Sequence, residues 1–177
     1  MKNLIKRYKF FIATVIIMSI IFLIDFNVGK KALSIVGYSF KEMLLVIPPI
    51  FVLLGLLDVW VPRETMIKYM GEGSGIKGVA LAIILGSAAA GPLYGAFPIA
   101  AVFMKKGVKF SNILIFIGAW STTKIPMFLF ELSSLGTKFA ITRLLIDIPG
   151  IIIIAYILLR FVTKEEINEL YKNAENL

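Results

Sequence analysis

The chain contains no cysteine and no histidine. Their absence excludes disulfide bonds, thiolate chemistry and imidazole bases, and it removes the usual ligands of zinc and copper. Charged residues are scarce as well, at 17% of 177 residues, whereas 59% are hydrophobic. Soluble domains average about 45–50% apolar and about 25% charged residues. The composition therefore predicts an integral membrane protein with no cofactor and no metal ion, whose binding groups are oxygen and nitrogen atoms.

The formal net charge of +8 does not indicate a nucleic-acid partner. The basic residues stand mostly at the ends of apolar runs and do not line one helix face. In that position lysine and arginine set membrane topology and contact lipid headgroups. We therefore expect the lipid bilayer as the partner of these charges.

The length fits one all-α bundle, residues 1–177, because each membrane helix needs about 20 residues. We expect a polytopic protein of about five membrane segments and a cytoplasmic tail; the ranges are about 8–26, 43–61, 78–104, 111–132 and 139–162, with the tail at 163–177. No small-residue cleavage site follows Ile24, so the first apolar run is expected to be a retained span.

Proline, glycine and capping residues indicate where the expected helices start, end or are interrupted. Pro48 and Pro49 are expected to interrupt the second span near its start. Pro62 suits the first turn of a short surface helix that a group of glycines ends, namely Gly71, Gly73 and Gly75. Thr163 precedes Glu166 by three residues, a capping-box pattern that predicts a polar helix in the tail.

The segment 78–104 is uncharged and of membrane length, but glycine and proline interrupt its middle. The interrupting positions are Gly86, Gly91, Pro92, Gly95 and Pro98. Unpaired backbone groups are costly in hydrocarbon, so a break persists only where protein covers it or a polar cavity solvates it. Such breaks place helix ends where substrates bind, and Tyr94 adds a hydroxyl. The alternative is tight helix packing through the small residues 86–91 and the Gly91–Gly95 spacing.

Whether this segment crosses the membrane is tested by the positive-inside rule. With one crossing, and with Lys124 set aside because it lies inside a span, the lysine and arginine residues divide equally between the two sides. With a segment that enters and returns, most of them fall on the side of the N-terminus. We therefore expect a re-entrant segment and a cytoplasmic N-terminus. A single crossing is the alternative, because a balanced count is also typical of proteins inserted in both orientations as antiparallel dimers.

The span 111–132 carries a polar stretch, W-S-T-T-K-I-P, made of Trp120, Ser121, Thr122, Thr123, Lys124, Ile125 and Pro126. A buried ammonium costs about 2.5–3.5 kcal/mol on insertion scales, so Lys124 must face protein or water. The three hydroxyls either bond the carbonyls that Pro126 frees or form a polar strip beside the Gly/Pro break. In the second case Lys124 attracts an anion or acts as a counter-ion.

Four further charged residues are predicted inside or near the membrane, namely Asp58, Glu131, Arg143 and Asp147. Arg143 and Asp147 are four apart and share a helix face. Glu131 is placed to reach Arg143 across a short loop and to lock the hairpin. We expect a structural clamp from this group, with proton coupling as the alternative; Asp58 is either interfacial or a partner of Lys124.

Three motifs in order give a resemblance to a known family. They are GPLYGAFPIAAVFMKKG (Gly91–Gly107), GAWSTTKIP (Gly118–Pro126) and FELSSLGTKFAITR (Phe130–Arg143). With them the chain resembles, over about residues 43–162, the predicted-permease family that includes the ArsP organoarsenical efflux permeases. The resemblance implies that the activity is efflux. It also implies that the chain is a half-size member of the family, which needs a second copy of itself or a second half-size partner to form a full transporter. Trivalent arsenicals bind thiolates, so a chain without cysteine does not inherit that substrate.

Together these features predict a multi-pass permease subunit of the cell membrane that moves a small solute or ion outward. Its pathway is expected to be lined by the Gly/Pro break and the W-S-T-T-K-I-P span, in a homodimer or in a heterodimer with a second half-size permease. A non-transporting subunit that assembles a larger membrane complex is the alternative. No nucleophile elbow, phosphate loop or histidine base is present in the sequence, so we do not expect an enzyme.

Overall fold

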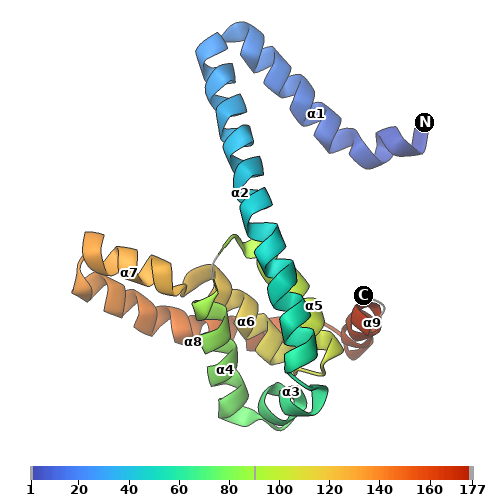
Figure 1. Ribbon diagram of the computed structural model, residues 1–177, viewed down its shortest axis with the longest axis vertical. Coiled ribbons are helices and arrows are strands. Elements are labelled where there is room, and N and C mark those ends of the chain that lie inside the picture. Colours follow the sequence, from blue (N-terminus) through green and yellow to red (C-terminus); the bar gives the residue numbers. More distant parts are fainter. Residues whose placement is uncertain (1, 90, 176–177) are drawn as a thin grey trace. The chain divides into compact units, whose positions relative to one another are not determined.

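The computed structural model describes residues 2–89 and 91–175. Side chains outside the description are those of residues 2–7, 42, 46, 47, 50, 51, 53, 54, 57 and 58, so the expectations for Asp58 lie outside it. Every element of the described residues is a helix. In chain order they are α1 (Lys2–Ile24), α2 (Phe26–Trp60), α3 (Arg63–Met70), α4 (Gly75–Ala88), η1 (Leu93–Gly95), α5 (Ala96–Lys105), α6 (Phe110–Thr122), α7 (Ile125–Ser134), α8 (Thr137–Phe161) and α9 (Lys164–Glu175) (Figure 1).

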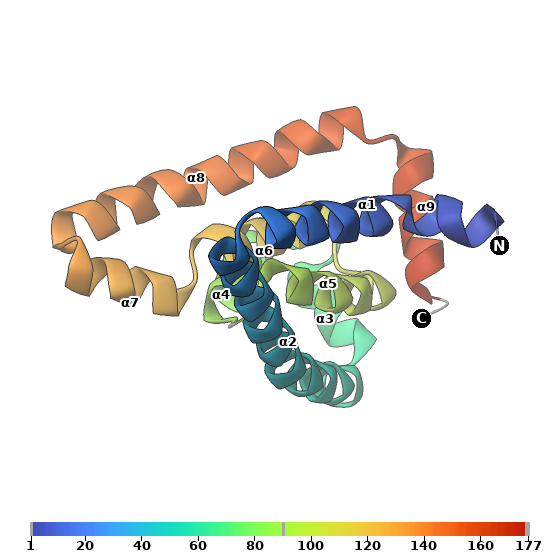
Figure 2. The same ribbon diagram turned by 90° about the horizontal axis from the view of Figure 1, so that it is seen from above.

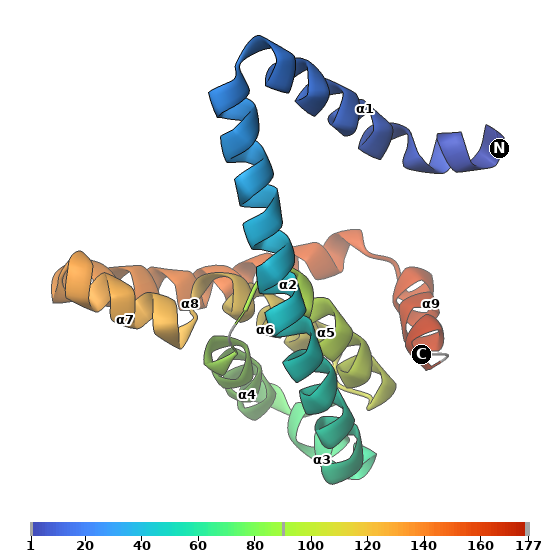
Figure 3. The same ribbon diagram turned by 45° about the horizontal axis from the view of Figure 1, so that its top comes forward.

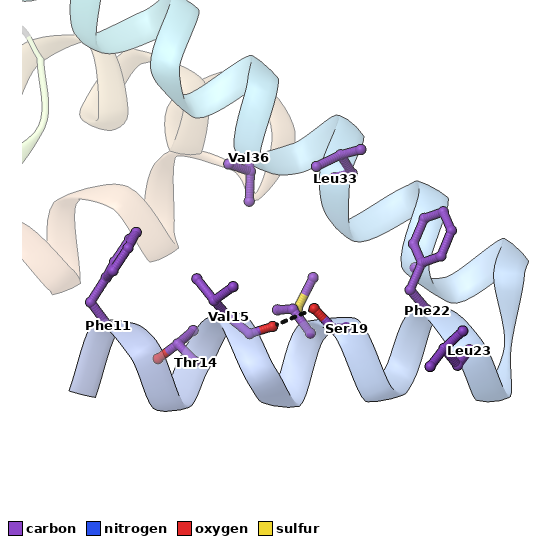
Figure 4. Close-up of a pocket in the computed structure, with 10 residues that line it drawn as sticks. Phe11, Thr14, Val15, Ser19, Phe22, Leu23, Leu33 and Val36 are labelled. Atoms are coloured by element: carbon purple, nitrogen blue, oxygen red, sulfur yellow. Dashed lines mark hydrogen bonds between the residues drawn. The ribbon is translucent and has the colours of Figure 1, made fainter. Parts of the chain in front are cut away.

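The chain divides into two compact units, Met1–Pro48 and Pro49–Leu177. In the first unit, α1 and the beginning of α2 meet at an elbow where the Asp25 carboxylate accepts hydrogen bonds from the amides of Asn27 and Val28. This is an N-cap, which satisfies amides that the new helix leaves unpaired. An open apolar groove of about 570 Å³ lies between the two helices, lined by residues such as Phe11, Val15 and Leu33 (Figure 4).

Helix α2 runs without interruption through Pro48 and Pro49, so the interruption expected there is wrong. The mixed segment 27–42 is also helical and continuous with it. Proline removes one hydrogen bond locally, but in an apolar setting the remaining backbone groups have no partner better than their own helix. The short helix expected after Pro62 is present as α3, which ends before Gly71.

In the second unit, α4 and α6 pack closely and run parallel. Gly78 faces Asn112, and Gly86 faces the carbonyl of Phe116 and the methyl group of Ala119. A Cβ atom at Gly86 would lie 2.5 Å from that carbonyl oxygen. Small residues spaced by four, with Ala82 between the two glycines, let the two backbones approach.

The chain turns back between α4 and α5. The amide of Lys109, the residue before α6, donates to the carbonyl of Met70, the last residue of α3, at 2.9 Å. The buried side chain of Asn112 donates to the same carbonyl and to the hydroxyl of Ser74. Helix α4 therefore leads away from α3, and α5 leads back toward it (Figure 3).

Helices α6, α7 and α8 form a second hairpin. Helix α6 begins beside the Met70 connection, α7 continues beyond its end, and α8 returns along both (Figure 2). Within the described residues, two segments are long and apolar enough to cross a membrane, Phe110–Ser134 and Thr137–Phe161. Three shorter apolar helices accompany them, Tyr8–Ile24, Gly75–Ala88 and Leu93–Lys105. The expected count of about five membrane segments remains a prediction.

The polar tail helix α9 packs against α5. The predicted capping box is present, because the Glu166 carboxylate accepts from the amide and hydroxyl of Thr163. These hydrogen bonds lower the pKa of Glu166. The Tyr171 hydroxyl donates to the carbonyl of Val108. Desolvation, with a smaller contribution from the charge of Glu72, raises the pKa of Tyr171 from 10.0 to about 12.

The α4–α6 approach predicts that Gly86→Ala destabilises the protein by about 1–3 kcal/mol, because the new methyl group meets backbone of α6. Gly150→Ala in α8 is the control, since a Cβ there meets nothing within 4 Å. Alanine favours a helix over glycine by up to about 1 kcal/mol, so the control is expected to be neutral or stabilising. Thermal unfolding in detergent measures both, and equal effects would contradict the packing.

Docking of α9 predicts a pH dependence through Tyr171. The folded protein favours the neutral phenol, so its stabilisation is complete below pH 10 and is lost as the pH rises from 10 toward about 12. Over that range the unfolding midpoint of the wild type is expected to fall more than that of Tyr171→Phe. Tyr156→Phe, at an exposed position of α8, serves as control and should follow the wild type. Parallel curves for wild type and Tyr171→Phe would refute this role.

Candidate functional site

Four helix ends meet at one level of the second unit. Because α4 and α6 run parallel, their carboxyl-terminal ends stop together, and the hydroxyls of Ser87 and Thr123 lie 2.7 Å apart across them. Helix α7 starts directly after α6, and α5 with its preceding turn η1 starts after the Gly/Pro break. Two helix breaks that are far apart in sequence therefore lie side by side.

The helices that end at this level are short. Helix α4 has 14 residues and α6 has 13, which at 1.5 Å per residue corresponds to about 21 and about 20 Å. The hydrocarbon core of a bilayer is about 30 Å thick. Neither helix by itself is that long, whereas α6 followed by α7 forms the segment Phe110–Ser134, which is long enough. We call α4 and α6 half-helices.

The first break is built by Gly91 and Pro92. Gly91 has φ +107°, a conformation that side chains disfavour, and Pro92 is extended with ψ 158°. The indole of the buried Trp120 on α6 donates to the carbonyl of Pro92 at 3.2 Å. The carbonyl of Pro92 thus receives its hydrogen bond from a side chain of α6 and not from helix backbone, and the bond connects the break to α6.

Lys124 connects the two breaks. It lies between α6 and α7, at the N-cap position of α7, and its ammonium donates to the carbonyl of Gly91. The carboxyl-terminal ends of α4 and α6 carry partial negative charge, so a cation is stabilised where they meet. The structure therefore places Lys124 on backbone oxygen.

The second break lies inside the expected span 111–132, where it separates α6 from α7 at Thr123 and Lys124. Pro126 stands in the first turn of α7, where its missing N–H is tolerated. The hydroxyls of Thr122 and Thr123 donate back to the carbonyls of Gly118 and Ala119. The Thr122 hydroxyl therefore bonds within its own helix, whereas the Thr123 hydroxyl also contacts Ser87 on α4.

Arg143 on α8 completes the second break. Pro126 has no N–H to offer the carbonyl of Thr122, and the guanidinium of Arg143 donates to that carbonyl at 2.7 Å. It also pairs with Glu131, which is only 6% exposed, and at 3.3 Å with Asp147. One side chain thus joins the end of α6 to α7 and α8.

The remaining predicted site residues divide by exposure. Tyr94, Ser121 and Pro126 are exposed at the two breaks, whereas Gly95 is buried and Pro98 lies inside α5. One contributor, Ser87, is not among the site residues that the sequence indicates. Ser87 sits in the last turn before a Gly/Pro break, which is a usable signal. In the described part of the chain, no three carboxylates come together to hold a metal.

The paired breaks define a class of protein. Interrupted helices whose ends meet within an apolar bundle are typical of membrane transporters, where helix ends contact substrate or ions. The family profile ArsP_1, described as "Predicted permease", matches residues 29–177. The chain belongs to this predicted permease family, and membership implies a membrane transporter rather than an enzyme. Comparison with curated proteins and with solved structures gives no match.

The clamp predicts that Arg143→Lys destabilises the protein, because one ammonium cannot bond a carbonyl and two carboxylates on three helices at once. We expect a loss of about 1–3 kcal/mol in the free energy of unfolding, the cost of leaving a buried acceptor unpaired. Arg160→Lys, at an exposed position near the end of α8, is the matched control and should change little. Thermal unfolding compares them, and a neutral Arg143→Lys would show that the clamp contributes nothing.

Proposed function

We propose that the chain is a permease subunit that moves a small solute or ion across the cell membrane, past the level where the two helix breaks meet. The observation that carries this proposal is the contact of Lys124 with Gly91, which joins two interrupted hairpins at the ends of half-helices. Interrupted backbone in an apolar bundle is kept where it lines a pathway. Outward transport is proposed from the family resemblance.

The α4–α5 hairpin supports a re-entrant segment. Its two ends lie together through the Lys109–Met70 hydrogen bond. The basic residues of the connections 62–77 and 105–109 therefore share one end of the unit. Positive charge marks the cytoplasmic side, so we place this end there, together with the tail 163–177 and the N-terminus.

A second copy of the chain, or a second half-size permease, is proposed to complete the pathway. At the breaks, Tyr94 is 43% exposed and Ser121 is exposed, although a hydroxyl facing hydrocarbon is unfavourable. Leu93 and Ile125 beside them are exposed as well. A partner subunit would cover Leu93 and Ile125, while the hydroxyls of Tyr94 and Ser121 would face a polar passage between the subunits.

One observation favours the alternative of a non-transporting assembly subunit. The carbonyls of Gly91, Pro92 and Thr122 each already accept a bond from a side chain, respectively Lys124, Trp120 and Arg143. Carbonyls that are bonded within the chain in this way are compatible with packing alone. A pathway would need water to reach this level, which is the property to measure.

Single cysteines provide the test, because the chain has none of its own. Tyr94→Cys and Ser121→Cys are expected to react with a membrane-impermeant thiol reagent, since a pathway is water-filled. Ile153→Cys is the control, at a 57% exposed apolar position of α8 that should face lipid and stay unreactive. If the two break positions react no faster than Ile153→Cys, the pathway is refuted and packing remains.

The same labelling determines topology. Lys77→Cys at the start of α4 and Lys105→Cys at the end of α5 are expected to label from one side of the membrane, and Lys138→Cys at the start of α8 from the other. Labelling of the first two from opposite sides would contradict the hairpin and leave a single crossing.

A further inference from the structure

The carboxyl-terminal ends of α4 and α6 form an environment suited to a cation. Each helix end carries partial negative charge, equivalent to roughly half an electron, and the two ends are held together by the Ser87–Thr123 contact of 2.7 Å. The two helix breaks offer the carbonyl of Gly91 and these two hydroxyls, which are neutral oxygen atoms of the kind that alkali cations bind. No described side chain at this junction contributes a negative charge; the carboxylates Glu131 and Asp147 are paired with Arg143.

The junction already holds a positive charge, the ammonium of Lys124 on the carbonyl of Gly91. We propose that this junction is a monovalent-cation site in which Lys124 is the resident cation. The tethered ammonium replaces a free alkali ion, so the wild-type protein does not need one to hold its helix breaks together. This inference rests on the proposed function, because it concerns the same junction of two helix breaks. It adds that the junction binds a monovalent cation.

A tethered cation differs from a simple hydrogen-bond donor in one measurable way. If only the hydrogen bond to Gly91 matters, a neutral donor in place of Lys124 suffices. If the positive charge matters, a neutral side chain leaves two facing helix ends uncompensated, and a free cation from solution takes the vacated place. The ligand linkage then makes the stability of the variant depend on the cation concentration.

The experiment compares thermal unfolding of the purified full chain in detergent, in NaCl or KCl and in N-methylglucamine chloride at equal ionic strength. Lys124→Met is expected to unfold at a lower temperature than the wild type in N-methylglucamine. Sodium or potassium should then raise its midpoint, by about 3–5 °C at ten times the dissociation constant. The wild type and Lys124→Arg should show no such response.

Two further variants complete the design. Lys124→Gln keeps an N–H donor without the charge, and it is expected to fold and to respond to sodium or potassium as Lys124→Met does. If Lys124→Met does not fold, Lys124→Gln alone decides. Lys138→Met removes an exposed lysine at the start of α8, away from the junction, and should behave as the wild type.

A Lys124→Gln variant as stable as the wild type and indifferent to the cation would overturn the proposal, as would a wild type that responds as strongly as the variants. The readout is stability in detergent and does not depend on transport. A cation response in the variants together with unreactive cysteines at Tyr94 and Ser121 would sustain the cation site while refuting the permease pathway.

Discussion

The structure of the second unit depends on how the backbone oxygens at two helix breaks are satisfied. Parallel packing of α4 and α6 brings two carboxyl-terminal ends to the same level. Within an apolar bundle, a backbone oxygen without a partner is costly, so these carbonyls need donors. The carbonyl of Gly91 accepts from Lys124, that of Pro92 from Trp120 and that of Thr122 from Arg143. Each donor belongs to a different element from its acceptor, so satisfying the breaks also assembles the bundle.

This requirement explains why cations appear in the interior of so apolar a chain. Two helix ends of the same sign repel each other, and a positive side chain between them offsets that repulsion. Lys124 serves the α4–α6 junction, while Arg143 serves the end of α6 and is balanced by Glu131 and Asp147. The charges are thus explained by local backbone electrostatics before any substrate is considered. A permease that uses this level must exchange such internal contacts for contacts with what it transports.

Several features were predictable because they depend on local sequence. The Gly/Pro break, the helix after Pro62, the capping box at Thr163 and the Glu131–Arg143 contact across a short loop all follow from spacing. Other features depended on neighbours that no local pattern reveals. Pro48 and Pro49 were expected to interrupt a helix that continues. Gly86, one of the small residues expected to allow close packing, does face α6, whereas its companions Gly78 and Ala82 were not expected, because only the position of α6 decides which small residues are covered.

The sequence by itself determined that this is an apolar, helical membrane protein without thiol or imidazole chemistry, and it indicated where two interruptions carry polar groups. Composition and spacing suffice for that, since they act residue by residue. Only the tertiary structure decided that α4 and α6 run parallel, that α6 ends at Thr122, and that Lys124 meets Gly91 from 33 positions away in the chain. Which donor reaches which freed carbonyl depends on how the helices pack in three dimensions. The residue pattern within one helix does not reveal which other helix packs against it.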